Sequence, residues 1–528
     1  MHVPIADTEA TALLPVDADS VHQNTAAIQD LEVVEPEALG RDQTANTIPE
    51  RPWYSKPLGI VAPSSSANPS KSTPQREVLG YAGSFFYLSN ALTGPGFFGF
   101  PKMLQQGGWV LSLAGLVMFT LATVYTAAFM ERIIKQVKGG NLPLPIYFGN
   151  KHPESEWRFS ELVRLIFTER AVFVFKVVYV GMLCMLTISC IHIAARATDS
   201  VLVSLAGNSY AITLYPILKI VASCDDSGDT VYEHTCQGGN LFYKYDEEYV
   251  FVTIGYMVLF AVSMCVAYHP LTDWGQRLLY WIGWFGLAYV LIGVATKTEW
   301  GGDIPAWPKN EPALPLEVSI LTFTLSFSIP LLVHVKAKDV KLDKILWHAV
   351  VQRSFEYSVF ALLFAGTFKD IQGLTAIELL HRRGYHIEAT TKTIGWFTMV
   401  ACVFENIVSY PQYIAFELSD VLTDMQASSI ALGVPWLLSW LVYSEASYNT
   451  LVNWMASLLC GVVNFIFPLL LFRGMSEELF PQMLFKVAGS SLHIEQWRTI
   501  SQYGINSIAF VIFLTYSLET SRLMASMM

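Results

Sequence analysis

Residues 90–101 contain the sequence Gly94-Pro95-Gly96, which interrupts an apolar segment. Without this interruption the segment would be long enough to cross a bilayer as one helix. Proline lacks a backbone N–H, and glycine costs about 1 kcal/mol relative to alanine within a helix. Unpaired backbone groups are expensive in hydrocarbon, so a break at this depth predicts that something binds there. The freed amides suit an anion such as a carboxylate. The alternative is a proline kink in a packing helix.

A second candidate break lies at residues 319–330. Hydroxyl side chains recur there at every second position from Thr322 to Ser328, ahead of Pro330. A period of two does not fit one face of a helix, so local unwinding is the first interpretation. The second is that each hydroxyl bonds back to a carbonyl one turn earlier, as serine and threonine often do in membrane helices.

A third element is the segment 404–413, in which Glu405, Ser409 and Gln412 follow helical spacing and share one face. A carboxylate in the middle of a membrane helix costs about 2.5–3.5 kcal/mol or more, so Glu405 should point inward. It is either a group that carries a proton or binds a cation, or a structural partner of a base such as Arg196 or Arg353. The sequence leaves both possibilities open.

The composition and the apolar spans indicate that these residues lie on transmembrane helices. The chain has 528 residues, of which 53% are hydrophobic and 15% are charged, well below the roughly 25% charge of soluble domains. Apolar spans recur at 79–102, 108–130, 171–205, 249–268, 278–296, 315–335, 346–367, 394–417, 427–444, 450–472 and 502–520. We therefore predict an all-α polytopic membrane protein with about eleven transmembrane helices.

The order of these spans predicts an inverted repeat. Breaks in the first and sixth helices are what a five-plus-five inverted repeat requires, with the substrate held where the breaks meet. The eleventh helix falls outside the repeat. The transmembrane domain then covers 78–521, between an N-terminal tail (1–77) that is predicted to be disordered and a short C-terminal tail (522–528).

Lysine and arginine are more frequent in the segments that share a side with the N-terminal tail, which predicts a cytosolic N-terminus. In the tail, Glu9, Leu13 and Leu14 form an acidic dileucine pattern of the kind read by sorting adaptors. The pattern suggests a vacuolar or lysosomal membrane, the plasma membrane being the other candidate. The loop 206–248 is expected outside, where Cys224 and Cys236 are predicted to form a disulfide, the alternative being two free thiols.

Three motifs resemble the amino acid/auxin permease family of amino-acid transporters. The stretch 89–101 followed by Gly107-Gly108-Trp109 resembles the opening of that family, Val408-Ser409-Tyr410-Pro411 its eighth-helix motif, and residues 461–468 its tenth-helix motif. The resemblance covers about residues 78–520 and implies the inverted-repeat transporter fold. Pro95 between the glycines and Phe97-Phe98 depart from the usual pattern.

The resemblance also implies site residues. The substrate carboxylate is expected at the first break and its amino group at carbonyls of the second. In sodium-coupled members the residues matching Asn90 and Ser409 contribute to a Na⁺ site, while Glu405 is the candidate proton carrier. The substrate-binding residues expected in this chain are Thr93, Gly94, Gly96, Phe97, Thr322, Phe323, Thr324 and Ser326.

The predicted function is secondary active transport of amino acids, small or neutral ones first, driven by H⁺ or Na⁺. The alternative is a transporter-like sensor that signals through its tail. No cofactor is expected beyond the co-transported ion. An enzyme is not expected, since the sequence contains no His-Glu-x-x-His motif, no Gly-x-Ser-x-Gly motif and no Cys-His cluster. The sequence also lacks a Gly-x-x-x-x-Gly-Lys-Ser/Thr motif, which argues against transport driven by ATP.

Overall fold

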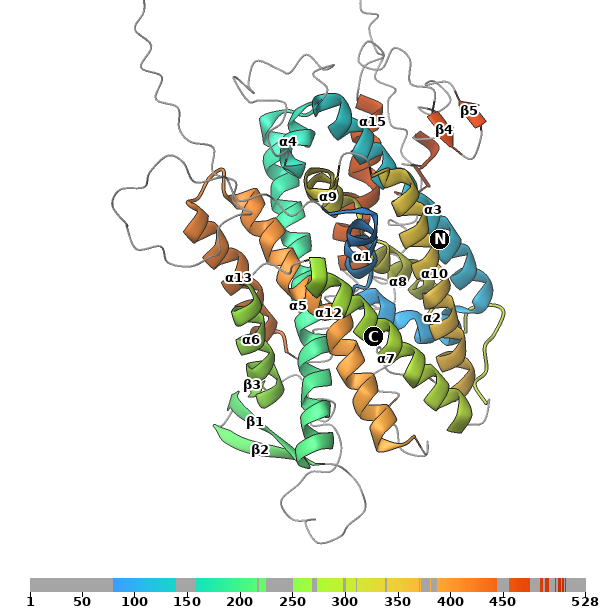
Figure 1. Ribbon diagram of the computed structural model, residues 1–528, viewed down its shortest axis with the longest axis vertical. Helices are drawn as coiled ribbons and strands as arrows, with labels where there is room; N and C mark the ends of the chain where they lie inside the picture. The colour runs from blue at the N-terminus through green and yellow to red at the C-terminus, as the bar shows by residue number, and fades with distance from the viewer. Residues whose placement is uncertain are drawn as a thin grey trace, which may run out of the picture. The chain divides into compact units, whose positions relative to one another are not determined.

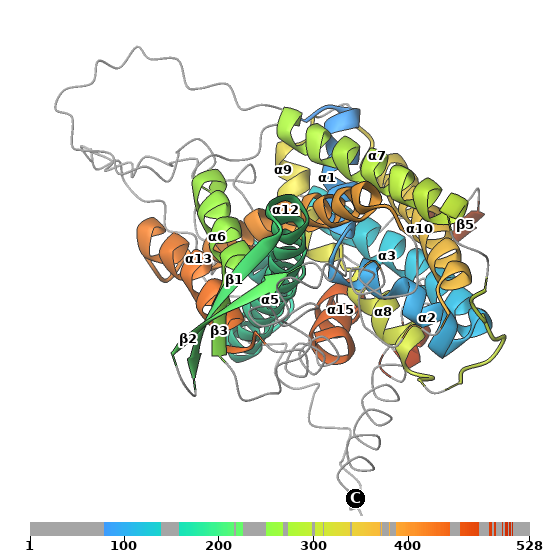
Figure 2. The ribbon, with the colours of Figure 1, turned by 90° about the horizontal axis from the view of Figure 1, so that it is seen from below.

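The computed structural model describes the greater part of the hydrophobic domain (Figures 1 and 2). The N-terminal tail with Glu9, Leu13 and Leu14 lies outside the described residues, as do Cys236 and the last residues of the chain. The predicted disulfide and sorting signal therefore stay predictions. The described residues are 79–138, 158–215, 218–224, 250–267, 273–297, 301–309, 311–337, 340–369, 371, 380, 387–443, 455–474, 485–487, 490–492, 499, 502–504, 506, 507 and 509.

The fold is mainly helical, and five described segments are long and apolar enough to cross a membrane. They are Trp109–Val137, Glu169–Ala206, Trp274–Thr296, Leu314–Val335 and Ala389–Leu418. Most of the other predicted spans coincide with helices that are shorter or less apolar. The eleventh predicted span lies mostly outside the described residues, so the expected number of helices and the inverted repeat remain predictions.

The first predicted span is broken, as the sequence indicated. Helix α1 (Tyr81–Leu92) ends before Thr93, a 3-10 turn η3 (Pro95–Gly99) follows, and α2 (Phe100–Gly107) completes the span. The sixth span is broken in the same manner. It consists of α8 (Leu314–Thr322), the turn η7 (Ser326–Ser328) and α9 (Ile329–Val335). Both predicted interruptions are thus confirmed.

The remaining long helices surround these two spans. α3 (Trp109–Lys138) and α10 (Leu342–Thr367) pack against α2 and each other, while α1 lies against α10 and α7 (Asp273–Lys297). α12 (Ala389–Leu418) packs along α5 (Glu169–Ala206) and α7, with α13 (Asp424–Leu441) beside it (Figure 1). A short helix α4 (Phe159–Arg164) precedes α5.

The tenth predicted span has an unusual helical winding. Residues Met455–Cys460 (η8) and Val462–Ile466 (η9) are π-helical, and α15 (Phe467–Gly474) continues the span. Single π-turns inside helices often mark functional sites, because the wider winding displaces backbone carbonyls. One such carbonyl, that of Asn464, accepts a hydrogen bond from Ser326 at the second break.

The prediction of a purely helical chain is wrong at one end of α5. Gly207 ends α5 with a φ of +80°, and an antiparallel sheet in the order β2-β1-β3 follows, from β1 (Asn208–Tyr215), β2 (Lys219–Cys224) and β3 (Val250–Thr253). The predicted span 249–268 accordingly starts as a strand, and α6 begins only at Ile254 (Ile254–Ala267). A second, two-stranded sheet pairs β4 (Phe485–Val487) with β5 (Ser490–Leu492).

A buried carboxyl group explains why the strand ends there. Asp199 near the end of α5 accepts hydrogen bonds from the Ser209 hydroxyl (2.7 Å), the Thr253 hydroxyl (2.5 Å) and the Gly255 amide (2.9 Å). These contacts join α5, β1, β3 and the first turn of α6. Hydrophobicity alone does not show this anchor, because the residues of β3 are as apolar as those of the helix.

Candidate functional site

The first break is closed by hydrogen bonds within its own stretch of chain. The amide of Thr93 donates to the carbonyl of Asn90 (2.9 Å), and the amide of Gly94 donates to the carbonyl of Leu92 (2.8 Å). Two of the three amides predicted to bind a carboxylate are therefore engaged by the preceding turn. A ligand that accepts hydrogen bonds from the Thr93 and Gly94 amides must therefore displace the carbonyls of Asn90 and Leu92.

The last carbonyls of α1 are occupied by donors from two other helices. Arg353 Nε donates to the Ser89 carbonyl (3.1 Å) and the Tyr357 hydroxyl to that of Leu92 (2.9 Å), both from α10. Asn406 Nδ2 of α12 donates to the Thr93 carbonyl (3.0 Å). The four C-terminal carbonyls of a helix lack partners inside that helix, so α10 and α12 stabilise the broken end of α1.

Gly94 and Gly96 differ in their surroundings. A Cβ atom at Gly94 would lie 3.8 Å from the Tyr410 hydroxyl, an ordinary contact, whereas one at Gly96 would lie 2.3 Å from Thr322 Oγ1 and 2.9 Å from the Thr322 amide nitrogen. Gly96 thus allows η3 to approach α8 closely. Gly94 faces space beside α12.

Phe97 lies in an aromatic cluster. Its ring is buried against Tyr357 (4.9 Å between centroids) and Phe360 (4.5 Å) of α10. It also lines a cavity of about 10 Å³ together with Asn90, Thr93 and Arg353, about the space that one water molecule needs. Phe97 therefore serves first as packing between η3 and α10.

At the second break, some hydroxyls bond back to a carbonyl of their own helix, and that of Ser326 bonds to neighbouring helices. Both interpretations of the sequence therefore apply, each to different residues. Thr322 bonds back to the Val318 carbonyl (2.7 Å), as serine and threonine do in membrane helices. Ser326 instead crosses to the Thr126 hydroxyl (3.0 Å) and the Asn464 carbonyl (2.8 Å).

The backbone between these two hydroxyls is held by α3. The Thr123 hydroxyl donates to the carbonyl of Phe323 (2.9 Å), and the Phe323 side chain is fully buried. Thr324 bonds back to Leu321 (3.3 Å). The expected substrate-binding segment thus lies at the centre of the helical packing, between α3 and the π-helical tenth span.

Two of the three predicted coupling residues are brought together. Asn90 of α1 is a hydrogen-bond partner of the Glu405 carboxyl group on α12, and its Nδ2 also donates to the Gln276 carbonyl of α7 (3.0 Å). Glu405 is 2% exposed, and its Oε2 atom has no hydrogen-bond partner within the described residues. Ser409 lies one turn further along α12, half-buried, with no hydrogen bond to either residue in the described part of the chain.

Arg353, one of the two bases considered as partners of Glu405, has a carboxylate partner of its own. Arg353 pairs with Glu356 on its own helix (2.6 Å), which leaves no described ion pair for Glu405. Arg353 is nevertheless close enough to act on Glu405 electrostatically. Both interpretations of Glu405, a group that carries a proton or binds a cation and a structural partner of a base, therefore stay open.

Tyr410 is a candidate site residue that sequence reasoning missed. Its hydroxyl is buried without a hydrogen-bond partner in the described part of the chain, and it faces Gly94. The ring of Phe327, next to the second break, contacts it edge-on at 5.6 Å between centroids. Tyr410 thus touches both breaks. The available signal was its place inside the eighth-helix motif, five residues after Glu405.

Comparisons with known proteins agree with the family resemblance. Residues 80–224 match the family model described as "Transmembrane amino acid transporter protein", a segment that contains the first break. A comparison with curated proteins found no match.

Two solved transporters show the same fold. A mutant of the manganese transporter of Eremococcus coleocola superposes with a TM-score of 0.52 at 12% identity, over 82% of this chain and 85% of that one. MhsT in complex with L-phenylalanine superposes with a TM-score of 0.52 at 10% identity, over 84% of this chain and 99% of that one. At such low identity the likeness concerns the fold alone. Together with the family match, it supports the transport of an amino acid or another solute across a membrane.

Proposed function

We propose that this chain, in which residues 80–224 match the transmembrane amino acid transporter proteins, is a secondary active transporter of amino acids. The observation that carries the proposal is the first break. It lies inside the matched segment, and it faces a buried Tyr410 hydroxyl that has no partner within the described residues. Buried polar groups are nearly always hydrogen-bonded, so one without a partner beside broken backbone is well suited to a polar ligand.

The proposed substrate position spans both breaks. The carboxylate binds at the amides of Thr93, Gly94 and Gly96 after the local bonds of Thr93 and Gly94 open, and the amino group binds at the carbonyls between Thr322 and Ser326. In support, Gly94 has room for a ligand atom next to Tyr410, and Tyr410 in turn contacts Phe327 beside the second break. A small or neutral side chain fits the crowded aromatic surroundings best.

For coupling we propose H⁺ or Na⁺ at the contact between α1 and α12. Asn90 and Glu405 are partners there, and the Glu405 Oε2 atom is buried without one in the described part of the chain, which supports proton exchange at Glu405. A Na⁺ at Asn90 and Ser409 is the other arrangement. There the Asn90 Oδ1 atom would be the ligand, while Nδ2 donates to the Gln276 carbonyl. One co-transported charge contributes about 2.3 kcal/mol per 100 mV, which corresponds to roughly fifty-fold accumulation.

Alternating access requires one group of helices to move against the other, and two contacts support movement of the half-helices in pairs. At one end, the Leu79 amide donates to the Val335 carbonyl (2.8 Å) and the Leu79 carbonyl accepts from Ala337 (2.9 Å), which links the start of α1 to the end of α9. At the other end, Lys102 of α2 forms an ion pair with Glu311, just before α8 (3.0 Å). Each half of the first span is thereby tied to one half of the sixth.

The test is uptake of radiolabelled alanine or proline by proteoliposomes that contain the purified full-length chain. A pH gradient and a Na⁺ gradient are imposed separately, and a panel of competing amino acids defines the side-chain range. Gradient-dependent accumulation of an amino acid is the expected result. Absence of uptake for every amino acid under both gradients contradicts the proposal, and binding without uptake favours a sensor.

We further propose a cytosolic N-terminus and a vacuolar, lysosomal or plasma membrane location. The distribution of lysine and arginine supports the orientation, and the dileucine pattern at Glu9, Leu13 and Leu14 supports sorting by adaptors. Fluorescence microscopy of the tagged chain with Leu13 and Leu14 replaced by alanine tests the sorting signal.

A further inference from the structure

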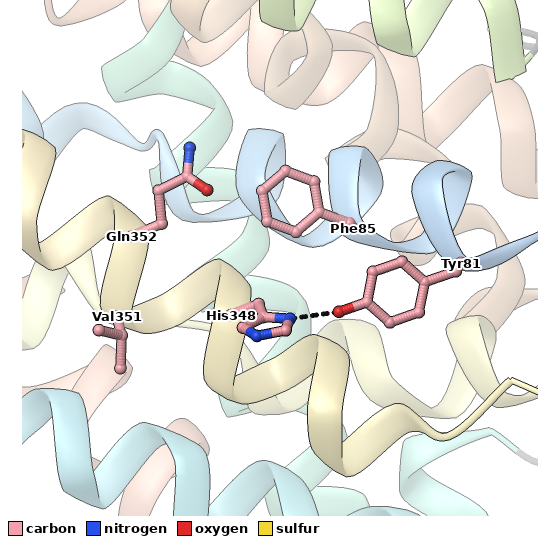
Figure 3. Close-up of a pocket in the computed structure, with 5 residues that line it drawn as sticks. All are labelled: Tyr81, Phe85, His348, Val351 and Gln352. Atoms are coloured by element: carbon pink, nitrogen blue, oxygen red, sulfur yellow. Dashed lines mark hydrogen bonds between the residues drawn. The ribbon is translucent and has the colours of Figure 1, made fainter.

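A groove away from the two breaks opens between the first turns of α1 and the first half of α10. Its volume is about 390 Å³, and it is lined by Tyr81 and Phe85 of α1 and by His348, Val351 and Gln352 of α10 (Figure 3). This is within the range of ligand sites, roughly 300–1,000 Å³. The transport site described above does not use any of these five residues.

The face of α10 that borders the groove changes in character along its length. Lys341, Lys344, His348, Val351 and Phe355 follow one another at helical spacing and are all exposed. The first three are basic or polar, and the last two are apolar. A polar-to-apolar change of this kind along one exposed face is typical of a helix that passes from the lipid headgroup layer into hydrocarbon.

The basic groups on this face are available to a ligand. Within the described residues, neither Lys341 nor Lys344 forms an ion pair. Asp343, the acidic residue between them, lies instead beside Glu131 and Arg132 of α3.

The polar side chains within the groove leave one ring nitrogen free. His348 Nδ1 is hydrogen-bonded to the Tyr81 hydroxyl (Figure 3), and its Nε2 has no partner among the described residues. Gln352 donates to the Tyr280 hydroxyl (2.7 Å) and to Glu356 (2.8 Å). The charge of Glu356 is balanced by Arg353. Lys341 and Lys344 are thus the charged groups on this face without a carboxylate partner among the described residues.

We propose that this groove binds one anionic phospholipid from the leaflet that surrounds the N-terminal ends of α1 and α10. The phosphate lies between Lys344 and His348 Nε2, and an acyl chain follows Phe85, Val351 and Phe355. Charge complementarity selects the anionic headgroup, and the apolar lower part of the groove selects a lipid over a free phosphate. About 1 kcal/mol per basic side chain near a membrane surface is usual for anionic lipids.

The position of the groove gives the lipid a role in regulation. α1 is the half-helix that ends at the first break, and the lipid would hold its other end against α10 through Tyr81 and Phe85. This consequence rests on the proposed transport function, whereas the binding itself does not. An anionic lipid is expected to change the rate of uptake without changing which amino acids compete.

The binding test uses the purified full-length chain and native mass spectrometry during titration with phosphatidylserine or phosphatidylcholine. One phosphatidylserine is expected to be retained, and phosphatidylcholine to be retained more weakly. Lys344→Gln should weaken phosphatidylserine binding about fivefold, and Val351→Trp, which fills the groove, should abolish it. Arg170→Gln removes an exposed charge from the first turn of α5, away from the groove, and serves as the matched control with unchanged binding.

Three results would overturn the proposal. They are equal retention of the two lipids, unchanged binding in both Lys344→Gln and Val351→Trp, and full competition by glycerophosphoserine, which has the headgroup but no acyl chains. Uptake assays on the same variants separate the two proposals. Lipid binding with no uptake under any gradient leaves the groove assignment standing and removes the transport function.

Discussion

Two buried carboxyl groups near helix ends, Asp199 and Glu417, are bonded differently from Glu405 and Tyr410 at the centre of the molecule. Near the helix ends, Asp199 accepts three hydrogen bonds, and Glu417 of α12 accepts from the Phe159 amide (2.8 Å), the Ser160 amide (3.3 Å) and the Ser160 hydroxyl (2.5 Å). At the centre, Glu405 Oε2 and the Tyr410 hydroxyl have no partner among the described residues.

The difference separates structural carboxyl groups from candidate functional ones. Asp199 and Glu417 are as buried as Glu405, so burial alone does not distinguish them. Each of the two joins helix or strand ends whose backbone donors would otherwise be unsatisfied. Glu405 lies in mid-helix, where the backbone of α12 satisfies itself and has nothing to offer a carboxylate. This difference makes Glu405 the candidate for a role other than folding.

The largest effect on stability is expected at Asp199, which accepts three hydrogen bonds. Asp199→Ala leaves two hydroxyls and one amide without an acceptor and should lower the free energy of unfolding by roughly 3–5 kcal/mol. Thermal unfolding in detergent measures it. Asp303→Ala is the control, because Asp303 pairs with Lys309 at the exposed surface (2.6 Å) and such pairs contribute little. Equal stability of the two variants would contradict the conclusion that Asp199 stabilises the fold.

At the centre, Glu405→Gln should leave stability nearly unchanged and remove proton coupling. Uptake would then no longer respond to an imposed pH gradient, a loss of up to about fifty-fold accumulation per 100 mV. Uptake at a series of pH values measures the change. If the pH profile of the variant matches that of the unaltered chain while its stability falls, Glu405 belongs with Asp199 and Glu417 as a structural residue.

The two glycines of the first break allow a similar comparison between a structural residue and a candidate functional one. Gly96→Ala places a methyl group 2.3 Å from Thr322 Oγ1 and 2.9 Å from the Thr322 backbone, and overpacking of this kind costs about 1–3 kcal/mol. Gly94→Ala meets only ordinary contact at a φ of −86°, which alanine adopts freely. We expect loss of stability for Gly96→Ala, and normal stability with reduced uptake for Gly94→Ala. Normal uptake by Gly94→Ala would move the carboxylate site elsewhere.

The smallest effect is expected for Tyr410→Phe. Loss of one hydrogen bond to the substrate, about 0.5–1.5 kcal/mol, should raise KM by roughly two- to tenfold without lowering stability. Tyr256→Phe is the matched control, since the Tyr256 hydroxyl donates to the Trp436 carbonyl (2.7 Å). That variant should lose stability and keep its KM. A reversed pattern would contradict the assignment of Tyr410 to the site.

Much of the fold could be predicted from local sequence. The breaks after Leu92 and Thr322 follow from glycine, proline and the spacing of hydroxyls. The sheet next to α5 could not be predicted in this way. Its strands are apolar enough to pass for helix, and the contacts of Asp199 with residues 10 to 56 positions away decide otherwise.

Part of the candidate site could not be predicted from local sequence either. Asn90 and Glu405 were singled out separately, but their contact joins residues far apart in the chain. Tyr410 stands out only through its buried hydroxyl, which has no partner among the described residues. Gly96 was expected to bind substrate, and its close approach to Thr322 depends on how α8 lies against η3.

The amino-acid sequence by itself determined that the chain is a helical membrane protein and where two of its helices break, because hydrophobicity, glycine and proline act on neighbouring residues. Only the tertiary structure decided which polar groups in the described chain are satisfied and which are not. Hydrogen bonds between helices depend on positions far apart in sequence, and a missing partner is visible only when the surrounding side chains are in place. In this chain that difference sets Asp199 and Glu417 apart from Glu405 and Tyr410.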